Sequence, residues 1–184
     1  MNDFSFGMNI SDICGMGLSF KLDGFRLMYV LIATFMWTVS TLFSLEYMKH
    51  YQRKGRYYFF LILTYFATVG VFLSADFYTT FIFFEIMSLA SFVWVAQDEK
   101  PESLRAAATY LGVAIIGGLV MLMGIFLLYD LTGTLNFDEL IGLSAQAGLL
   151  REIGYPETET RLWAAAVCLL VGFAAKAGDL PHKN

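Results

Sequence analysis

Long runs of apolar residues dominate this 184-residue chain. A helix needs about 20 apolar residues to cross the ~30 Å hydrocarbon layer of a membrane, and it satisfies its backbone hydrogen bonds internally. Only 15% of the residues are charged, whereas soluble domains average about 25%. The sequence therefore predicts an all-α integral membrane protein, with one membrane domain over residues 1–184 and about five transmembrane helices. The expected helices cover about 25–46, 57–75, 77–97, 104–129 and 162–178.

The positive charges between these runs predict the orientation of the chain. Four Lys or Arg residues lie in loop 47–56 and two lie in loop 98–105. Loops rich in Lys and Arg stay on the cytoplasmic side of a membrane. We therefore expect both loops in the cytoplasm and the N-terminus outside, in a bacterial inner membrane.

Composition and motifs argue against several kinds of partner. The net charge of −4 and the lack of a basic stripe argue against nucleic acid. No dinucleotide-binding glycine motif, Walker loop, haem motif or iron–sulfur motif appears. The cysteines (Cys14, Cys168) and histidines (His50, His182) are too scattered for a metal site. We expect no cofactor and no metal, so any redox chemistry would take place on other chains.

Local patterns predict how two helices begin and where a third helix could pack. Asp76 ends a very short turn and can cap the helix that follows. Pro101 fits the first turn of a helix, where a missing N–H costs nothing. Ala114 and Gly118 have the small-xxx-small spacing that lets another helix approach closely, although glycine is also common in membrane helices for no special reason.

Region 130–161 is expected to be an extracytoplasmic loop that contains a short amphipathic helix. Asn136 and Glu139 have the spacing of a capping box, in which each side chain bonds the other residue's backbone N–H. The helix would lie along the membrane surface or against a partner. Its apolar face would comprise Leu140, Ile141, Leu143 and Leu149.

Glu85 lies near the middle of the third apolar run, TTFIFFEIMSLASFVW. A charge at the centre of a bilayer costs about 2.5–3.5 kcal/mol or more, so such residues are functional by default. On a helix, the face that carries Glu85 would also carry Tyr78, Ser88 and Phe92. The alternative is a neutral glutamate that only forms a hydrogen bond inside the bundle.

Lys176 ends the last apolar run, WAAAVCLLVGFAAKAG. Counted from Leu162, this run reaches only about 21–23 Å at 1.5 Å per residue, which would leave the amine below the membrane surface. Gly178 and Pro181 would then mark a broken helix, as in transporter ion sites. The alternative is an ordinary anchoring lysine that extends to the interface.

A buried Glu85–Lys176 pair could transfer protons. Opposite charges ~7 Å apart attract by about 2 kcal/mol at an effective dielectric of ~20, whereas burial favours the neutral form of each group. A lysine held cationic by a glutamate would release its proton when that glutamate is neutralised or drawn away. Glu85 and Lys176 are therefore the candidate site residues, as a proton-transfer pair.

The segments LSFKLDGFRLMYVLIATF, FFEIMSLASFVWVA and LLVGFAAKAG resemble the antiporter-like subunits of complex I and its relatives. These are the L, M and N chains of proton-translocating NADH:quinone oxidoreductase, the large subunits of Mrp cation antiporters, and the matching subunits of energy-converting hydrogenases. The resemblance, over about residues 18–178, implies that the chain corresponds to part of the first half-channel repeat. It also implies that Glu85 modulates the charge of Lys176, that Lys176 exchanges the proton, and that Asp23-Gly24 is a structural pair.

The chain departs from this family after Lys176, where it reads GDLPHKN instead of a PLHxWLP-type segment. Family members also have a second inverted repeat. We expect a truncated, frame-shifted or split gene, whose product is a proton- or Na⁺-translocating subunit or a fragment of one. Its partners would be other membrane subunits of a respiratory complex and the lipid bilayer. The alternatives are a structural or assembly subunit and a non-functional product; the ion, the electron donor and a role for quinone stay open.

Overall fold

The computed structural model describes residues 6–10, 17–50, 54–96, 100–150 and 156–177. Most of them are helical, which confirms the predicted all-α class. The elements, in chain order, are β1 (Phe6–Ile10), β2 (Leu18–Leu22), α1 (Gly24–Tyr47), the short 3₁₀ helix η1 (Met48–His50), α2 (Lys54–Leu73), α3 (Phe77–Val95), α4 (Pro101–Thr132), α5 (Phe137–Leu150) and α6 (Pro156–Ala177).

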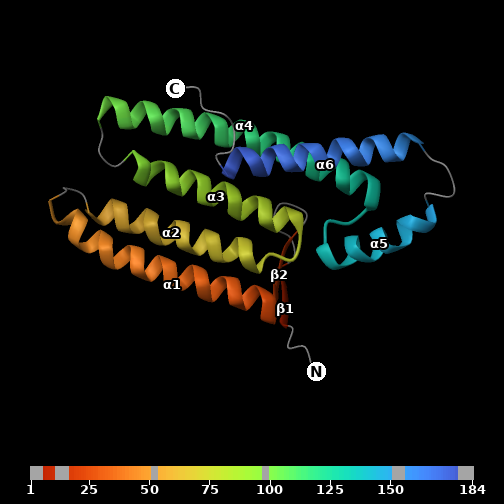
Figure 1. Ribbon diagram of the computed structural model, residues 1–184, viewed down its shortest axis with the longest axis horizontal. Coiled ribbons are helices and arrows are strands. Elements are labelled where there is room, and N and C mark those ends of the chain that lie inside the picture. Colours follow the sequence, from red (N-terminus) through yellow and green to blue (C-terminus); the bar gives the residue numbers. More distant parts are fainter. Residues whose placement is uncertain (1–5, 11–16, 51–53, 97–99, 151–155, 178–184) are drawn as a thin grey trace.

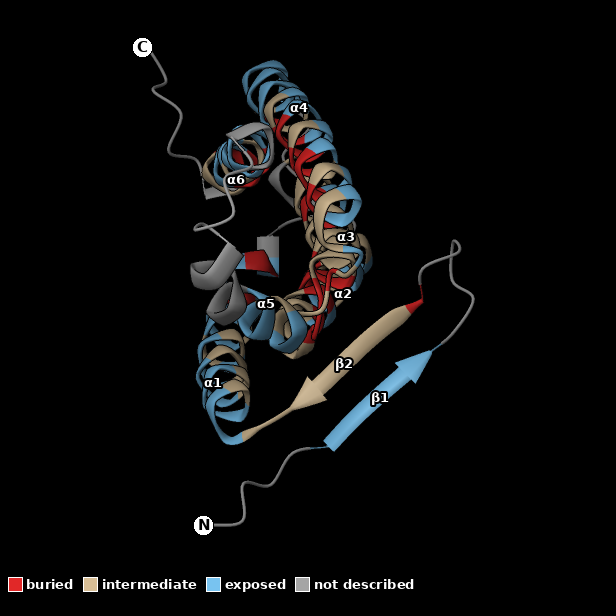
Figure 2. Ribbon diagram, turned by 90° about the vertical axis from the view of Figure 1, so that its right-hand side faces the viewer, coloured by how far each residue is buried: buried red, intermediate tan, exposed pale blue. Residues whose placement is uncertain are grey.

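The long helices α1, α2, α3, α4 and α6 run roughly antiparallel along the long axis of the molecule (Figure 1). Contacts join them in the order α1, α2, α3, α4 and α6, and end-on they form an arc (Figure 2). By length and hydropathy α1, α2 and α4 can cross a membrane, while α3 holds a shorter apolar stretch, Phe77–Val93. The count of five spans stays a prediction.

The two basic connections join helices at the same end of the bundle, where α1 and α3 end and α2 and α4 begin (Figure 1). The α2–α3 turn and the hairpin lie at the other end, which we call the hairpin end. The connections are shorter than expected from the sequence, because α1 extends to Tyr47, α2 begins at Lys54 and α4 begins at Pro101. Pro101 therefore lies in the first turn of a helix, as predicted. Which end faces the cytoplasm stays a prediction.

A two-stranded antiparallel hairpin, β1 with β2, was not expected from the sequence. It packs across the end of the helices, because the Ser19 carbonyl accepts a hydrogen bond from Ala75 N (2.8 Å). The backbone N–H of Ser19 also donates to the Thr79 hydroxyl (2.9 Å). Strands of five residues carry little periodic signal, so these long-range bonds are needed to define them.

Asp76 caps α3, as the sequence predicted. Its Oδ1 accepts a hydrogen bond from the backbone N–H of Thr79 (2.5 Å), and its side chain is buried. The hydroxyls of Ser74 and Thr80 share a further bond across the same turn (2.6 Å). These bonds fix the start of α3 and therefore the rotation of the helix about its axis.

Replacing Asp76 by alanine should destabilise this end of the bundle. Loss of a capping side chain costs about 0.5–2 kcal/mol, and here it also leaves a buried N–H without its acceptor. We expect a lower melting temperature for the detergent-solubilised protein. Asp76→Asn keeps an acceptor oxygen and should lose clearly less; equal losses for both variants would contradict the capping role.

The start of α5 agrees only partly with the predicted capping box. The Asn136 side chain accepts a hydrogen bond from Asp138 N (3.0 Å) and so caps the helix. The reciprocal bond is absent among the described residues, because the Glu139 carboxylate accepts from the Thr134 hydroxyl instead. The backbone N–H of Asn136 donates to the same Thr134 hydroxyl (3.2 Å). Thr134 is therefore the acceptor for this N–H, which in a capping box would be the Glu139 side chain.

The apolar face predicted for α5 is only partly buried. Leu140 packs against the core, whereas Ile141 and Leu143 are exposed; the side chain of Leu149 lies outside the described residues. The loop predicted over 130–161 is shorter than expected, because α4 extends to Thr132 and α6 begins at Pro156.

The most extensive helix contact among the described elements is between α4 and α6, and three glycines let these helices approach each other. A Cβ at Gly117 would lie 2.5 Å from the Cβ of Ala175, and one at Gly124 would lie 3.0 Å from the Ala165 carbonyl oxygen. On α6, a Cβ at Gly172 would collide with Met121. Gly117 and Gly124 thus face α6, whereas Ala114 and Gly118, the pair predicted to allow a close helix approach, are both buried, and Gly118 lies against Glu85 of α3. The buried cluster beside it comprises Met121, Ile125, Leu128, Leu135, Ala165 and Leu169.

Helix α6 is longer than the sequence indicated. It begins at Pro156, six residues before the predicted start, and continues through position 176 to Ala177. The predicted break at Gly178 and Pro181 lies outside the described residues.

Candidate functional site

Glu85 points from α3 onto α4. Its Oε1 is shielded from solvent. A Cβ built on Gly118 would lie 3.0 Å from the Glu85 Cδ and 3.3 Å from Oε2, and nearer still to Oε1. The distance to Oε1 is shorter than real Cβ atoms show, and the other two are shorter than in most real Cβ contacts. The carboxylate therefore occupies the space that the missing side chain of Gly118 leaves open.

The α3 face predicted around Glu85 is packed. Ser88 is buried and its hydroxyl donates to the Phe84 carbonyl within the helix (2.9 Å). Tyr78 packs against the buried cluster of α4 and α6, and Phe92 is half-buried. This face of α3 therefore packs against the rest of the bundle, with Ser88 fully inside it.

Position 176 lies in the last described turn of α6, and the structure does not describe the Lys176 side chain. Two neighbours of position 176 are described. Ala175 packs against Gly117 of α4, and the Phe173 ring meets the Phe84 ring of α3 edge to face, with centroids 5.5 Å apart. The turn that carries Lys176 is thus held against both α3 and α4.

Two consecutive glycines of α4 connect the candidate segments. Gly117 contacts α6 at Ala175, the residue before Lys176, and Gly118 contacts the Glu85 carboxylate. Because these glycines are adjacent, the carboxylate and the Lys176 turn meet α4 at the same level. The structure brings together the two segments that the sequence singled out; the bond between their charged groups stays a prediction.

A cleft of about 500 Å³ lies beside α3 and α6. Phe84 of α3 and Phe173 of α6 both line it. Further along its wall, Arg26 Nε and Asp23 Oδ2 form an ion pair (3.2 Å), and the guanidinium also donates to the Ser74 carbonyl. Asp23 caps α1 through its bond from Arg26 N (2.8 Å). The aromatic pair thus lines the same cleft as this ion pair.

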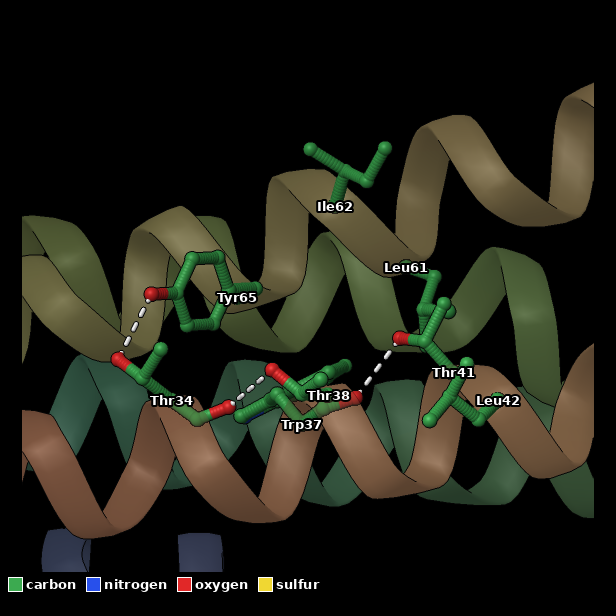
Figure 3. A pocket seen from close by; sticks show the side chains of 8 residues that line it. All are labelled: Thr34, Trp37, Thr38, Thr41, Leu42, Leu61, Ile62 and Tyr65. Carbon is green, nitrogen blue, oxygen red and sulfur yellow. Dashed lines mark hydrogen bonds between the residues drawn. The ribbon is translucent and has the colours of Figure 1, made fainter.

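A second cavity, of about 290 Å³, lies between α1 and α2 (Figure 3). The Thr34 hydroxyl shares a hydrogen bond with the Tyr65 hydroxyl (2.8 Å). The Thr38 and Thr41 hydroxyls donate to carbonyls one turn earlier in α1 (2.7 Å each). None of the described residues that line this cavity is charged, so we assign it to helix packing. Among the described residues, no three His, Cys, Asp or Glu side chains cluster as metal ligands.

Sequence reasoning missed two parts of the site. It read Gly118 only as a helix-packing residue, and it did not single out Phe84 and Phe173 as partners. Each phenylalanine lies within three residues of a candidate charge in the sequence, which was the available signal. The glycine pair was visible as GG, but only the packing shows which glycine faces which helix.

The fold and the site define a class of protein: an antiparallel helical membrane bundle with a half-buried glutamate whose Oε1 is shielded from solvent beside a glycine. A sequence model described as the NADH:quinone oxidoreductase/Mrp antiporter transmembrane family matches residues 74–183. The match covers more than half of the chain and includes both Glu85 and Lys176. The chain belongs to this family.

Curated relatives agree with this assignment. The chain is 35% identical over 164 residues to a putative antiporter subunit mnhD2 of Staphylococcus saprophyticus. It is 34% identical over 161 residues to the putative antiporter subunit mnhD2 of Staphylococcus aureus strain Newman. Each alignment covers 88% of this chain and 30% of the relative. The chain therefore spans less than a third of the length of these relatives.

Solved structures share the fold. The membrane-bound sulfane sulfur reductase, an archaeal respiratory membrane complex, matches with a TM-score of 0.73 at 23% identity, over 95% of this chain and 25% of that one. The Mrp complex from Dietzia sp. DQ12-45-1b matches with a TM-score of 0.76 at 21% identity, over 94% of this chain and 18% of that one. Both therefore show the arrangement of helices alone.

Proposed function

We propose that this chain forms part of a proton- or Na⁺-translocating antiporter subunit, in which Glu85 and Lys176 are a proton-transfer pair. The observation that carries the proposal is the pair of adjacent glycines: Gly118 contacts the carboxylate and Gly117 contacts the turn before Lys176. The segments that carry an acidic residue and a basic residue thereby contact α4 at adjacent positions. Membership of the antiporter family supports the transport of ions.

The proposed mechanism couples charge to proton release. With Glu85 ionised, the Lys176 amine keeps its proton because opposite charges attract by about 2 kcal/mol at ~7 Å and a dielectric of ~20. When Glu85 takes up a proton or loses its contact with the amine, this attraction disappears. Desolvation then favours the neutral amine, which passes its proton to water or to the next acceptor along the path.

The setting of this chemistry is part of the proposal. The chain would assemble with other membrane subunits of an Mrp-type, complex I-type or hydrogenase-type complex in a bacterial inner membrane, surrounded by lipid. The basic connections α1–α2 and α3–α4 would face the cytoplasm and the hairpin end would face outside. Any oxidation and reduction would take place on other chains.

Glu85→Gln tests the proposal in the assembled complex. The amide keeps the size of the side chain and removes its charge, so about 2 kcal/mol of attraction that holds the proton on Lys176 should be lost. The population of the protonated amine should then fall about thirtyfold, and exchange through it should slow in proportion. The measurement is cation-driven proton movement in everted membrane vesicles, followed with a pH-sensitive dye.

Glu102→Gln is the matched control, because Glu102 is exposed in the first turn of α4. It should transport like the wild type. Normal transport by Glu85→Gln, at wild-type amounts of complex, would reject the transfer role. Reduced assembly with unchanged transport per complex would favour the alternative of a structural subunit.

A further inference from the structure

We propose that Gly118 is a positioning residue for the Glu85 carboxylate, and that its missing side chain sets the depth at which this carboxylate sits between α3 and α4. The three atoms nearest to a Cβ at Gly118 all belong to the Glu85 side chain: Oε1, Cδ (3.0 Å) and Oε2 (3.3 Å). Gly118 is buried. The space of one methyl group that Gly118 leaves open thus sets how closely the carboxylate approaches α4.

The neighbouring glycine has a different role. The atoms nearest to a Cβ at Gly117 belong to α6: the Cβ of Ala175 (2.5 Å) and the Gly172 carbonyl oxygen (3.6 Å). A methyl group there would push one helix away from another. At Gly118 its three nearest atoms would all belong to the end of one flexible side chain.

A methyl group at Gly118 should therefore move the carboxylate and leave the helices in place. Carbon and oxygen need more than 3 Å between them, so the Glu85 headgroup would shift on the order of 1 Å. A displacement of this size in a reacting group can slow a reaction by about a hundredfold. The inference rests on the proposed function for its consequence on transport, but the contact itself can be tested without it.

The first measurement is ion transport by Gly118→Ala in the assembled complex. We expect normal amounts of complex and transport slowed at least about tenfold. Gly112→Ala is the matched control, because Gly112 is exposed on the same helix with nothing within 4 Å of its Cβ position. Both variants gain the same helix propensity. Equal transport by the two would overturn the inference.

The second measurement is rescue by a shorter acid. Glu85→Asp removes one methylene and withdraws the carboxylate from the space that the new methyl group takes. We expect Gly118→Ala combined with Glu85→Asp to transport faster than Gly118→Ala alone, although Glu85→Asp alone is slower than the wild type. A merely structural defect at Gly118 would not be rescued, and additive losses would overturn the inference.

A third measurement does not depend on transport. In a double-mutant cycle of melting temperatures, Gly118→Ala should lower the melting temperature with Glu85 present and have no such effect with Glu85→Ala. An equal effect in both backgrounds would overturn the inference. Coupling here, together with normal transport by Glu85→Gln, would support the contact and reject the proposed transport role, so the two failures can be distinguished.

Discussion

Lys176→Ala is expected to abolish ion transport in a complex that still inserts and assembles. Under the proposed mechanism this amine carries the proton, so its removal takes away the transferring group. Positioned acid–base groups contribute about 10²–10⁴-fold to reaction rates, so the loss should be at least about a hundredfold. The measurement is cation-driven proton movement in vesicles with matched amounts of complex. Lys49→Ala is the control, because Lys49 is an exposed lysine paired with Glu46 outside the site.

Lys176→Arg separates the proposed role from simple anchoring. Arginine keeps the positive charge and also reaches a membrane interface, but it does not release its proton in proteins. A lysine that only anchors the helix could be replaced by arginine without loss. A lysine that exchanges a proton could not, so we expect Lys176→Arg to assemble normally and to transport as poorly as Lys176→Ala. Wild-type transport by Lys176→Arg would reject the proton-exchange role.

Gly124→Leu is expected to prevent stable assembly. A Cβ at Gly124 would already lie 3.0 Å from each of three α6 atoms, which belong to Ala165, Cys168 and Leu169. None is the far end of a flexible side chain, so a leucine would have to push α6 away from α4. Overpacking a tight contact costs roughly 3 kcal/mol or more in such cases, which corresponds to more than about a hundredfold loss of the packed state.

The amount of complex after detergent extraction and its resistance to protease measure this loss. Gly112→Leu is the matched control on the same helix, because the space around Gly112 is open. It should assemble like the wild type. A Gly124→Leu complex as abundant and as protease-resistant as the control would contradict the close α4–α6 contact.

Much of the fold could be predicted from the sequence because its signals are local. Continuous apolar runs indicated membrane helices, Asp76 indicated the start of α3, and Asn136 indicated the start of α5. The hairpin and the length of α6 could not be predicted in this way. The hairpin depends on bonds from Ser19 to residues more than fifty positions away, and the first turns of α6 are too polar to read as a membrane span.

The candidate site, too, could be predicted from the sequence only in part. A carboxylate in an apolar run is conspicuous by its desolvation cost alone, so Glu85 could be named from the sequence. The position of its carboxylate oxygens could not be predicted, because α3 is apolar on nearly all sides. Such a helix does not specify which face meets a neighbour.

The sequence by itself determined the membrane class, the helix starts at Asp76 and Asn136, and the presence of an acidic group in an apolar helix. Only the tertiary structure decided that Gly117 contacts α6 while Gly118 contacts the Glu85 carboxylate. The reason is physical: hydrophobicity and capping act within a few residues, whereas the rotation and depth of packed helices follow from the fit of side chains from three separate segments. A difference of one position along α4 therefore separates a helix contact from a contact with the charged group.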